Sequence, residues 1–304
     1  MTPTAALRTL RRMIPRLLVT GGSGFLGAHL CERARDAWDV SYTCRARSLP
    51  PRAGEAFRLD LGDAAAVARV VRAARPEVLL HTAYSPVEAD FDAVIVRGTE
   101  AVARAAAETG AALVHVSTDM VFDGESAPYD EDAEPRPVFP YGRAKAEAEG
   151  RARRHCPDAL LVRPSLLYAL APPDPRLARN LADADAGREV VLFDDEWRCP
   201  AEVGDMADAL LAVAVRLLAQ RRGSEAAPLP PVLHLPGPER LTRWGFGIAV
   251  LTTLGAPLAT VRRGTARELG LARPRDLTLA TRRTPPEFLR PLRPLAAVLA
   301  APRR

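Results

Sequence analysis

Short apolar runs alternate with segments of helical periodicity along the first half of the chain. These patterns predict strands at residues 16–20, 40–44, 57–60, 78–82, 112–117 and 159–163, and helices at 24–37, 63–74, 90–109 and 141–155. Strands that alternate with helices of this length are typical of an α/β fold, a Rossmann-like, doubly wound parallel sheet. Sheets of this class bind ligands at the carboxyl ends of their strands.

The pattern changes after residue 163. A group of prolines (Pro164, Pro172, Pro173 and Pro175) indicates a loop-rich region, and the acidic run at 194–196 is expected in a solvated loop. Further on we predict a helix at 205–220, a surface loop at 221–231, a strand at 232–235, a helix at 242–254 and weak periodicity thereafter. The predicted organisation is an N-terminal tail (1–15), a Rossmann domain (16–164) and a smaller C-terminal substrate lobe (165–304), with the region 205–238 returning to the Rossmann domain.

Composition narrows the class of protein. The 304 residues are 48% hydrophobic, which suits a sizeable core, and carry a formal charge of +5 with a pI near 9.4. The basic residues are scattered without an aromatic-interleaved stripe, so we expect no nucleic acid partner. No apolar run reaches the ~20 residues of a membrane span, and residues 1–15 lack the apolar core of a secretory signal. We expect no membrane association and a cytoplasmic location.

The cysteines and histidines do not gather into a metal site. The four cysteines (Cys31, Cys44, Cys156 and Cys199) form no close pair, so they are expected to be reduced and buried, as is usual in the cytoplasm. The five histidines (His29, His81, His115, His155 and His234) are dispersed and are expected to be structural. We therefore predict no bound metal.

A glycine-rich turn follows the first predicted strand and opens the first predicted helix. Gly21, Gly24 and Gly27 have the spacing G-x-x-G-x-x-G. The first permits a tight turn, the second lets the backbone approach a pyrophosphate, and the third allows close packing of helix on strand. The helix N-terminus offers free N–H groups and a positive dipole end to phosphates. We therefore predict a dinucleotide cofactor bound by Gly21, Ser23, Gly24, Phe25, Leu26 and Gly27.

Residues after the second and third predicted strands bear on the choice of cofactor. An acidic residue after the second strand would bind the ribose 2′-hydroxyl of NAD, but the chain has Arg45 and Arg47, which can pair with a 2′-phosphate. This favours NADP(H), while NAD(H) stays open because both arginines could be solvated loop charges. Asp60 and Leu61 end the third strand, where a carboxylate can meet the adenine amino group. The alternative for Asp60 is a helix N-cap region with Asp63.

The single lysine is the sharpest chemical signal. Lys145 is the only lysine among 42 basic residues, and it lies four positions after Tyr141, on the same helix face. A nearby ammonium lowers the pKa of a tyrosine from its free value of about 10. Tyr141 can then protonate the oxygen of a carbonyl group that receives a hydride. The compact head of Lys145 can also bind the nicotinamide ribose, which arginine does poorly. The alternative is an ordinary start of an amphipathic helix.

A hydroxyl group completes the predicted catalytic set. Thr118 lies at the carboxyl end of the fifth predicted strand, where its side chain can hold the substrate oxygen beside Tyr141. Two alternatives stay open: Ser117 is the active hydroxyl, or both residues only cap the strand end. We predict Thr118, Tyr141 and Lys145 as the catalytic residues.

These motifs resemble those of the extended short-chain dehydrogenases/reductases, and more narrowly the dTDP-4-dehydrorhamnose reductase family. The resemblance lies in TGGSGFLG at 20–27, STDMVFDG at 117–124, YGRAK at 141–145 and LVRPSLLY at 161–168. It implies an NADP(H)-dependent reductase that acts on a nucleotide-linked 4-keto-6-deoxysugar, with Tyr141 as the proton donor. It also implies that Thr82 and Ala83, after the fourth strand, lie near the cofactor, and it allows a homodimer.

Several positions depart from the family pattern. Met120 stands where the family usually has tyrosine, and Ile95 where related enzymes often carry asparagine; His81 also replaces a usual asparagine. The substrate could therefore be another carbonyl compound, and an epimerase of the same class is a further alternative. A non-catalytic, dinucleotide-binding regulatory protein is the third, since some relatives have that role.

Overall fold

The computed structural model describes residues 14–46, 48–50, 53–223 and 227–302. Arg47 and nearly all of the predicted tail at 1–15 lie outside these residues. The strands are β1 (Arg16–Thr20), β2 (Asp39–Cys44), β3 (Glu55–Arg58), β4 (Val78–His81), β5 (Ala112–Val116), β6 (Leu160–Pro164), β7 (Leu167–Tyr168), β8 (Val190–Phe193), β9 (Trp197–Arg198), β10 (Ala201–Glu202), β11 (Val232–Leu235), β12 (Leu241–Thr242) and β13 (Val261–Gly264).

The α-helices are α2 (Phe25–Ala34), α3 (Ala64–Ala74), α4 (Gly98–Thr109), α5 (Pro140–His155), α6 (Pro175–Asp185), α7 (Val203–Arg221), α8 (Arg243–Thr253) and α9 (Leu295–Ala300). Short helical segments lie at η2 (Glu88–Asp90), η3 (Phe91–Arg97), η4 (Asp119–Val121) and η5 (Pro286–Phe288). Side chains cap several of these helices. Asp63 caps α3 and Asp174 caps α6, each by accepting hydrogen bonds from backbone N–H groups of the first turn.

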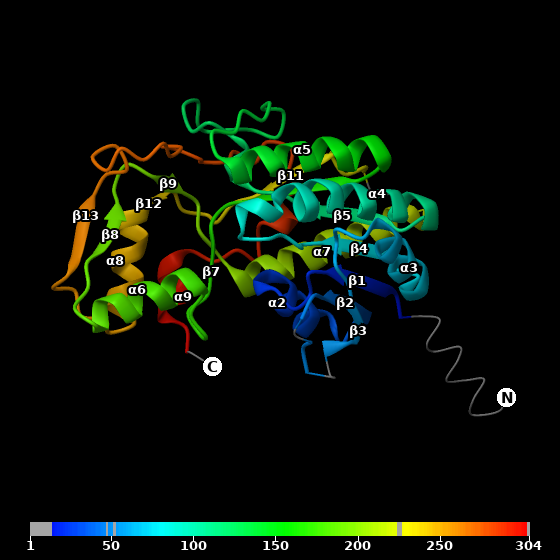
Figure 1. Ribbon diagram of the computed structural model, residues 1–304, viewed down its shortest axis with the longest axis horizontal. Helices are drawn as coiled ribbons and strands as arrows, with labels where there is room; N and C mark the ends of the chain where they lie inside the picture. The colour runs from blue at the N-terminus through cyan, green and yellow to red at the C-terminus, as the bar shows by residue number, and fades with distance from the viewer. Residues whose placement is uncertain (1–13, 47, 51–52, 224–226, 303–304) are drawn as a thin grey trace. The chain divides into compact units, whose positions relative to one another are not determined.

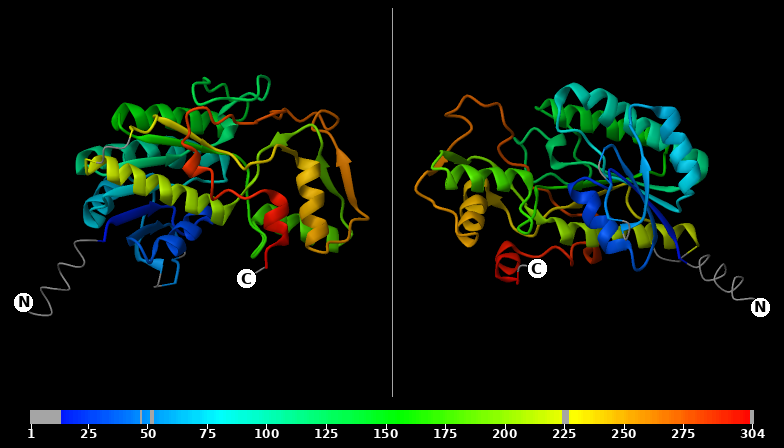
Figure 2. Two further views of the ribbon diagram at one scale, coloured as in Figure 1. Left: turned by 180° about the vertical axis from the view of Figure 1, so that it is seen from behind. Right: turned by 60° about the horizontal axis from the view of Figure 1, so that its bottom comes forward.

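A seven-stranded sheet has the strand order β11-β6-β5-β4-β1-β2-β3. β1 pairs in parallel with both β2 and β4, β2 pairs with β3, and β4 pairs with β5. Figures 1 and 2 show α4 and α5 along one face of these strands and α2 and α7 along the other. Every residue of β4 and β5 is buried, as expected for strands covered on both faces. The predicted fold class is confirmed.

The chain divides into two compact units. The first comprises residues up to Val116, Glu147–Leu161 and Leu210–Pro231, and the second comprises Ser117–Ala146, Val162–Ala209 and the residues from Val232 onward. The chain therefore passes between the two units several times. The sequence suggested instead one boundary near residue 164 and one return of the chain, at 205–238, to the Rossmann domain. That predicted boundary stays a prediction about domain organisation.

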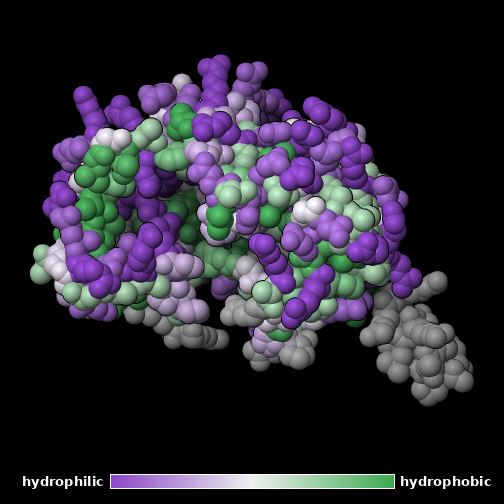
Figure 3. All heavy atoms as spheres, viewed as in Figure 1, coloured by the Kyte–Doolittle hydropathy of each residue, from purple (hydrophilic) through white to green (hydrophobic). Residues whose placement is uncertain are grey.

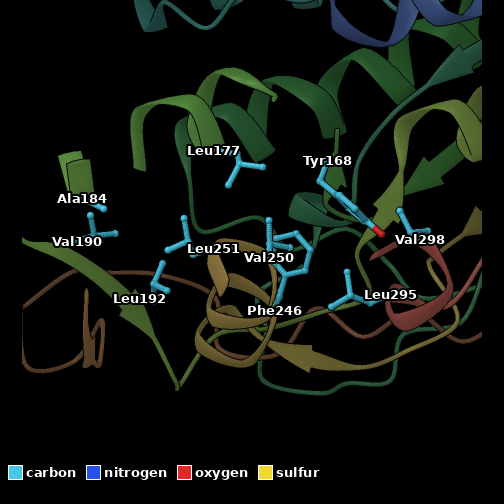
Figure 4. Packing of buried hydrophobic residues seen from close by; sticks show 10 residues of the cluster. All are labelled: Tyr168, Leu177, Ala184, Val190, Leu192, Phe246, Val250, Leu251, Leu295 and Val298. Carbon is cyan, nitrogen blue, oxygen red and sulfur yellow. The ribbon is translucent and has the colours of Figure 1, made fainter. Parts of the chain in front are cut away.

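The second unit has its own apolar core, which Figure 4 shows in close-up. Aromatic and aliphatic side chains from β7, β8, α6, α8 and α9 pack together there. The Tyr168 ring lies edge-on to Phe246, with 5.0 Å between centroids. Among the described residues, the buried hydroxyl of Tyr168 has no hydrogen-bond partner, and burial raises the pKa of this group well above its usual range.

Two regions differ from the sequence-based expectation. The helix predicted at 90–109 is a true α-helix only from Gly98, because the preceding stretch forms the π-helical segment η3. That stretch contains the β-branched residues Val94, Ile95 and Val96, which favour regular α-helix less than straight side chains do. The region after Pro164, which was expected to be rich in loops, contains α6 and four short strands, β7 to β10. Three of these strands have only two residues, which is too short to leave a readable period.

Three further observations concern the described residues as a whole. All four cysteines are buried and free, which confirms the prediction of buried thiols. In the part of the chain that the structure describes, no helix is long and apolar enough to span a bilayer, and no three metal-binding side chains gather in one place. Hydrophilic residues cover most of the face seen in Figure 3, and apolar residues form separate patches on it.

Candidate functional site

The glycine turn lies between β1 and α2 in the first unit. Gly21 has a left-handed φ of +73°, and a Cβ on it would lie 2.6 Å from Ala83 Cα. A Cβ on Gly27 would lie 2.2 Å from the Gly21 carbonyl oxygen, and Gly24 donates a backbone hydrogen bond to that same oxygen over 2.9 Å. Real Cβ atoms cannot approach as closely as those at positions 21 and 27 would, so the turn requires glycine at these two positions, while a Cβ on Gly24 would be tight, at 3.0 Å from the same oxygen. Two of the three glycines in the spacing therefore have a steric basis in the structure.

Gly22 is a third required glycine, which the spacing argument did not single out. A Cβ on Gly22 would lie 2.4 Å from Tyr42 Cβ on the neighbouring strand β2. The turn is fixed to the same strand by Thr43, whose side-chain oxygen accepts from Gly21 N over 3.0 Å. Because Tyr42 and Thr43 are remote in sequence from the turn, only the sheet reveals their role.

The N-terminus of α2 is open to an anion. Gly24 is the N-cap residue and supplies no side-chain cap, and no acidic residue occupies the first turn. Ser23, Phe25 and Leu26 complete the turn around this helix start, as the sequence suggested. Uncapped N–H groups at a helix start, approached through glycines, are the usual cradle for a phosphate. The residues present therefore suit the diphosphate of a dinucleotide.

Arg45 follows β2 and lies between two carboxylates. Its guanidinium group is 4.0 Å from Asp60 Oδ2 and 3.6 Å from Asp90 Oδ2. Asp90 comes from η2, far along the chain, so its position beside Arg45 could not be read from the residues that follow β2. The side chain of Arg45 is 69% exposed, so these pairs contribute little stability and leave the guanidinium accessible.

The remaining residues predicted to contact the cofactor fall into two groups. Thr82 lies next to Ala83 and hydrogen-bonds to the Thr20 carbonyl oxygen, which places both at the glycine turn. Asp60 lies two residues beyond β3 and accepts from Gly62 N over 2.9 Å, while Asp63 is the helix cap. Leu61 is buried and packs against Gly98 at the start of α4.

A buried histidine, His81, links the residue before the glycine turn to helix α4. His81 Nδ1 lies 2.6 Å from Thr20 Oγ1, and His81 Nε2 lies 2.9 Å from Thr99 Oγ1. Thr20 directly precedes Gly21, so His81 ties the end of β1 to α4. The sequence showed His81 only as a departure from the family pattern. In the structure, its two hydrogen bonds hold Thr20, and with it the start of the turn, in place. A second departure from the family pattern, Ile95, is fully buried and is a core residue.

The predicted catalytic residues all belong to the second unit. Tyr141 lies in the first turn of α5, and Lys145 follows one turn later with only 3% of its surface exposed. Thr118 is the N-cap of η4, and its Oγ1 accepts from Met120 N over 3.2 Å. Thr118 thus has the capping role that was weighed as an alternative. Ser117 is buried, and its hydroxyl has no partner among the described residues.

Gly142 brings the start of α5 against the segment that follows Thr118. A Cβ on Gly142 would lie only 2.1 Å from the Met120 carbonyl oxygen. Any larger residue would therefore push the two segments apart, and with them Tyr141 and Thr118, which flank this contact in sequence. The glycine of the Y-G-x-x-K motif was missed by the sequence argument, although it stands in the motif itself.

Asp119 is a second functional candidate that the sequence argument passed over. Its carboxylate is buried; Oδ1 accepts from Thr118 Oγ1 over 3.3 Å, and Oδ2 accepts from Ser165 Oγ over 2.7 Å. Burial raises the pKa of the Asp119 carboxyl, and the charge of Arg198, 4.0 Å away, offsets part of this effect. Asp119 therefore holds the hydroxyl of Thr118 in a fixed direction.

The acidic run at 194–196 is only partly the solvated loop that the sequence suggested. Asp194 forms an ion pair with Arg263, and Asp195 accepts from the backbone N–H of Ala266. Glu196, however, is only 2% exposed and lies 3.3 Å from Arg273. The expectation was wrong for Glu196, because a buried arginine environment cannot be recognised from neighbours in sequence.

The fold and the site together define an oxidoreductase of the short-chain dehydrogenase/reductase type: a glycine turn follows β1, and a Tyr-x-x-x-Lys helix follows β5. The family model described as "RmlD substrate binding domain" matches residues 15–301, and the chain belongs to this family. The resemblance seen in the sequence is thereby confirmed.

Relatives fall into two groups. A dTDP-4-dehydrorhamnose reductase of Mycobacterium tuberculosis is 33% identical over 308 residues, covering 94% of this chain and 93% of the relative. A methionine adenosyltransferase 2 subunit beta of Xenopus tropicalis is 28% identical over 276 residues, covering 84% and 77%. The relatives of this chain thus include proteins named as reductases and proteins named as subunits of another enzyme.

Solved structures share the fold. A dTDP-4-dehydrorhamnose reductase from Bacillus anthracis, in complex with NADP, has a TM-score of 0.71 at 23% identity and covers 88% of this chain and 90% of its own. DesIV, a dTDP-glucose 4,6-dehydratase from Streptomyces venezuelae with NAD and TYD bound, has a TM-score of 0.76 at 24% identity and covers 94% of both chains.

Proposed function

We propose that this protein is an NADP(H)-dependent reductase of a nucleotide-linked 4-keto-6-deoxysugar, with dTDP-4-dehydrorhamnose as the first substrate to test. The observation that carries the proposal is the close contact between Gly142 and Met120, which holds the Tyr141–Lys145 helix start against the segment after Thr118. The reductase of M. tuberculosis, similar over almost the whole chain, supports the substrate class.

The chain's own residues divide the chemistry among them. The glycine turn and the uncapped start of α2 would hold the cofactor's diphosphate. When bound, NADPH supplies the hydride that is added to the carbonyl carbon of the sugar. Tyr141 donates its phenolic proton to the carbonyl oxygen, and Lys145 stabilises the phenolate that is left. Thr118 has a single hydroxyl proton, which Asp119 accepts in this structure. With substrate bound, that proton would be donated to the same carbonyl oxygen instead and would orient it.

The preference for NADPH over NADH rests on Arg45. Its exposed guanidinium group can pair with a 2′-phosphate, while Asp60 and Asp90 beside it could bind a ribose hydroxyl instead. NAD(H) therefore stays a candidate cofactor. Three other predictions also go forward untested: the contact of Lys145 with the nicotinamide ribose, a homodimer, and a cytoplasmic location.

The test is turnover of dTDP-4-dehydrorhamnose, followed by the absorbance of NADPH and, in parallel, of NADH. In Tyr141→Phe the proton donor is lost, and kcat should fall by a factor of about 10²–10⁴ while the Kd for NADPH is unchanged. Lys145→Arg keeps the charge but changes its shape, and it should lose activity too. Tight NADPH binding by the wild-type protein without turnover would reject this substrate.

A regulatory role is the second candidate, favoured by one observation. Several relatives at 27–29% identity are named methionine adenosyltransferase 2 subunit beta, and this name does not describe an oxidoreductase. The turnover assay separates the two roles. A regulatory subunit would bind a dinucleotide and leave 4-keto sugars unreduced, and Tyr141→Phe would then change nothing measurable.

A further inference from the structure

A chain of hydrogen bonds links Thr118 to the interior of the second unit. Thr118 Oγ1 lies 3.3 Å from Asp119 Oδ1, and Ser165 Oγ donates to Asp119 Oδ2 over 2.7 Å. The backbone N–H of Cys199 donates in turn to Ser165 Oγ over 3.1 Å. All four residues belong to the second unit and are buried, so these hydrogen bonds are shielded from bulk water. We call this chain of hydrogen bonds the Thr118 relay.

Ser165 decides which oxygen of Asp119 can hold a proton. Its hydroxyl has one proton to donate, and because Cys199 N–H occupies a lone pair of Ser165 Oγ, that proton points to Asp119 Oδ2. Oδ2 is therefore an acceptor in either charge state of the carboxyl group. A proton bound to Asp119 then lies on Oδ1, the oxygen that faces Thr118.

The two charge states of Asp119 have opposite effects on Thr118. Thr118 Oγ1 already accepts a hydrogen bond from Met120 N over 3.2 Å. An ionised Asp119 takes the single proton of Thr118 and leaves it nothing to donate to a substrate. A protonated Asp119 instead donates from Oδ1 to the second lone pair of Thr118 Oγ1, and the proton of Thr118 is then free to point at a carbonyl oxygen.

The surroundings of Asp119 favour the protonated form. The charged group that faces its carboxyl group is Arg198, 4.0 Å away, and Arg198 also lies 3.9 Å from the buried Glu196. Burial raises the pKa of Asp119 by more than the charge of Arg198 and the hydrogen bond from Ser165 lower it. Burial also raises the pKa of the neighbouring Cys199 thiol, which is therefore neutral and adds no charge.

We propose that Asp119 and Ser165 are positioning residues that direct the hydroxyl proton of Thr118 to the substrate: Ser165 keeps the proton of Asp119 on Oδ1, and protonated Asp119 leaves Thr118 free to donate. This inference rests on the proposed function, in which Thr118 binds the carbonyl oxygen. Tyr141 remains the residue that transfers a proton, whereas Thr118 only donates a hydrogen bond. Such a donor stabilises the negative charge that develops on the oxygen during hydride transfer.

Asp119→Asn separates this role from a purely structural one. The asparagine amide accepts from Ser165 with its oxygen and donates to Thr118 with its nitrogen, so it imitates protonated Asp119 at every pH. Its kcat should stay within about threefold of the highest wild-type value, whereas Asp119→Ala, which cannot donate, should lose about 10²-fold. Wild-type kcat should decline as pH rises through the folded-state pKa of Asp119, and Asp119→Asn should lack this decline.

Ser165→Ala removes the donor that fixes the orientation of the carboxyl group. The proton can then lie on either oxygen, and kcat should fall about tenfold. Thr284→Val is the matched control, because Thr284 also donates a buried hydroxyl to a carboxylate of the second unit, Glu131, over 2.8 Å. Thr284→Val should lose stability but keep the wild-type kcat and pH profile. The Kd for NADPH should be unchanged in every variant.

Infrared difference spectra between wild type and Asp119→Asn report the charge of Asp119 without any substrate. The absorption of a protonated carboxyl group should persist above pH 3.8, the ordinary pKa of aspartate, and should disappear at the pH where wild-type kcat declines. In Ser165→Ala the midpoint of this titration should move to higher pH, because a hydrogen bond to the ionised form is lost.

The proposal is overturned if Asp119→Asn loses kcat as Asp119→Ala does, if Asp119 is ionised over the whole pH range of turnover, or if Ser165→Ala leaves the infrared midpoint unmoved. A wild-type protein that does not reduce the keto sugar would instead refute the proposed reaction. The infrared titration would then still decide whether Asp119 holds a proton that Ser165 controls.

Discussion

The glycine turn of the first unit and a group of arginine side chains in the second unit, here called the arginine cluster (Arg176, Arg198, Arg243 and Arg273), are built in opposite ways. The turn is made of backbone: Gly21, Gly24 and Gly27 lie within one short stretch, and the uncapped N–H groups of α2 carry the positive charge. The cluster is made of side chains spread along the chain from Arg176 to Arg273. The turn depends on the absence of a Cβ at its glycines, whereas the cluster depends on the charged guanidinium groups of its arginines.

The difference has a physical consequence for substitution. In the turn, adding one methyl group collides with backbone atoms that have no alternative position. In the cluster, shortening a side chain causes no collision, but it leaves a buried carboxylate with fewer partners, as Glu196 would be without Arg198 or Arg273. We therefore expect substitutions in the turn to cost both stability and cofactor affinity through collision, and substitutions in the cluster to cost stability through unpaired buried charge.

The largest effect is expected from Gly21→Ala, compared with Gly110→Ala. Both glycines have a left-handed φ, +73° and +71°, so alanine adds the same backbone strain of about 1 kcal/mol or more at either position. Only at Gly21 does the new Cβ also collide, 2.6 Å from Ala83 Cα, whereas at Gly110 it meets nothing within 4 Å. The collision should add about 1–3 kcal/mol and weaken NADPH binding.

Chemical denaturation and NADPH titration of both variants check this comparison. Gly110→Ala should keep wild-type affinity for the cofactor and lose only the stability that corresponds to the backbone strain, about 1 kcal/mol or more. Equal losses of stability and affinity in the two variants would mean that strain, and not contact with Ala83, sets the requirement for glycine in the turn.

Part of this architecture could be predicted from the sequence, because the residues that form it lie close together along the chain. The β–α alternation, the turn and the Tyr141–Lys145 pair each lie within a single window of the chain, where periodicity and spacing are readable. Asp90 beside Arg45, Tyr42 against Gly22 and the burial of Glu196 depend on segments that only folding brings together. Gly142 was readable but overlooked, since a glycine inside a helix suggests weak propensity before it suggests close contact.

Gly142→Ala should be the next largest effect, with Gly150→Ala in the same helix as its matched control. The new Cβ at 142 would lie 2.1 Å from the Met120 carbonyl oxygen, while at 150 it meets nothing within 4 Å. Displacing the start of α5 moves Tyr141 away from Thr118, and a shift of about 1 Å at an active site can cost about 10²-fold in rate. Gly150→Ala should instead stabilise α5 by up to about 1 kcal/mol.

Steady-state kinetics and thermal unfolding distinguish these outcomes. Gly142→Ala should lose kcat with an unchanged Kd for NADPH, because the cofactor turn is untouched. If Gly142→Ala keeps full activity, the contact with Met120 does not position Tyr141, and the main support for the proposed function disappears.

The smallest expected effect is on the pH dependence of stability, and it compares two buried carboxylates of the second unit, Glu131 and Asp119. Glu131 accepts hydrogen bonds from the backbone N–H groups of Arg282, Arg283 and Thr284 and from the Thr284 hydroxyl. Burial alone would raise its pKa, but these hydrogen bonds hold the pKa of Glu131 below its ordinary 4.5. Its stabilising contribution is therefore fully present above pH 4.5 and is lost as pH falls through the lower, folded-state value.

Asp119 should behave in the opposite sense. Burial holds its pKa above the ordinary 3.8, so the folded protein favours the protonated form, and its contribution is lost as pH rises from 3.8 through the folded-state value. Thermal unfolding of Asp119→Asn and Glu131→Gln between about pH 2 and pH 8 tests both signs, because the Glu131 effect appears only below pH 4.5. Relative to wild type, Asp119→Asn should gain stability as pH rises, whereas Glu131→Gln should be most destabilised at neutral pH and approach wild type in acid. A parallel pH dependence in the two variants would show that Asp119 stays ionised in the folded protein, and its hold on Thr118 would then be that of a full negative charge.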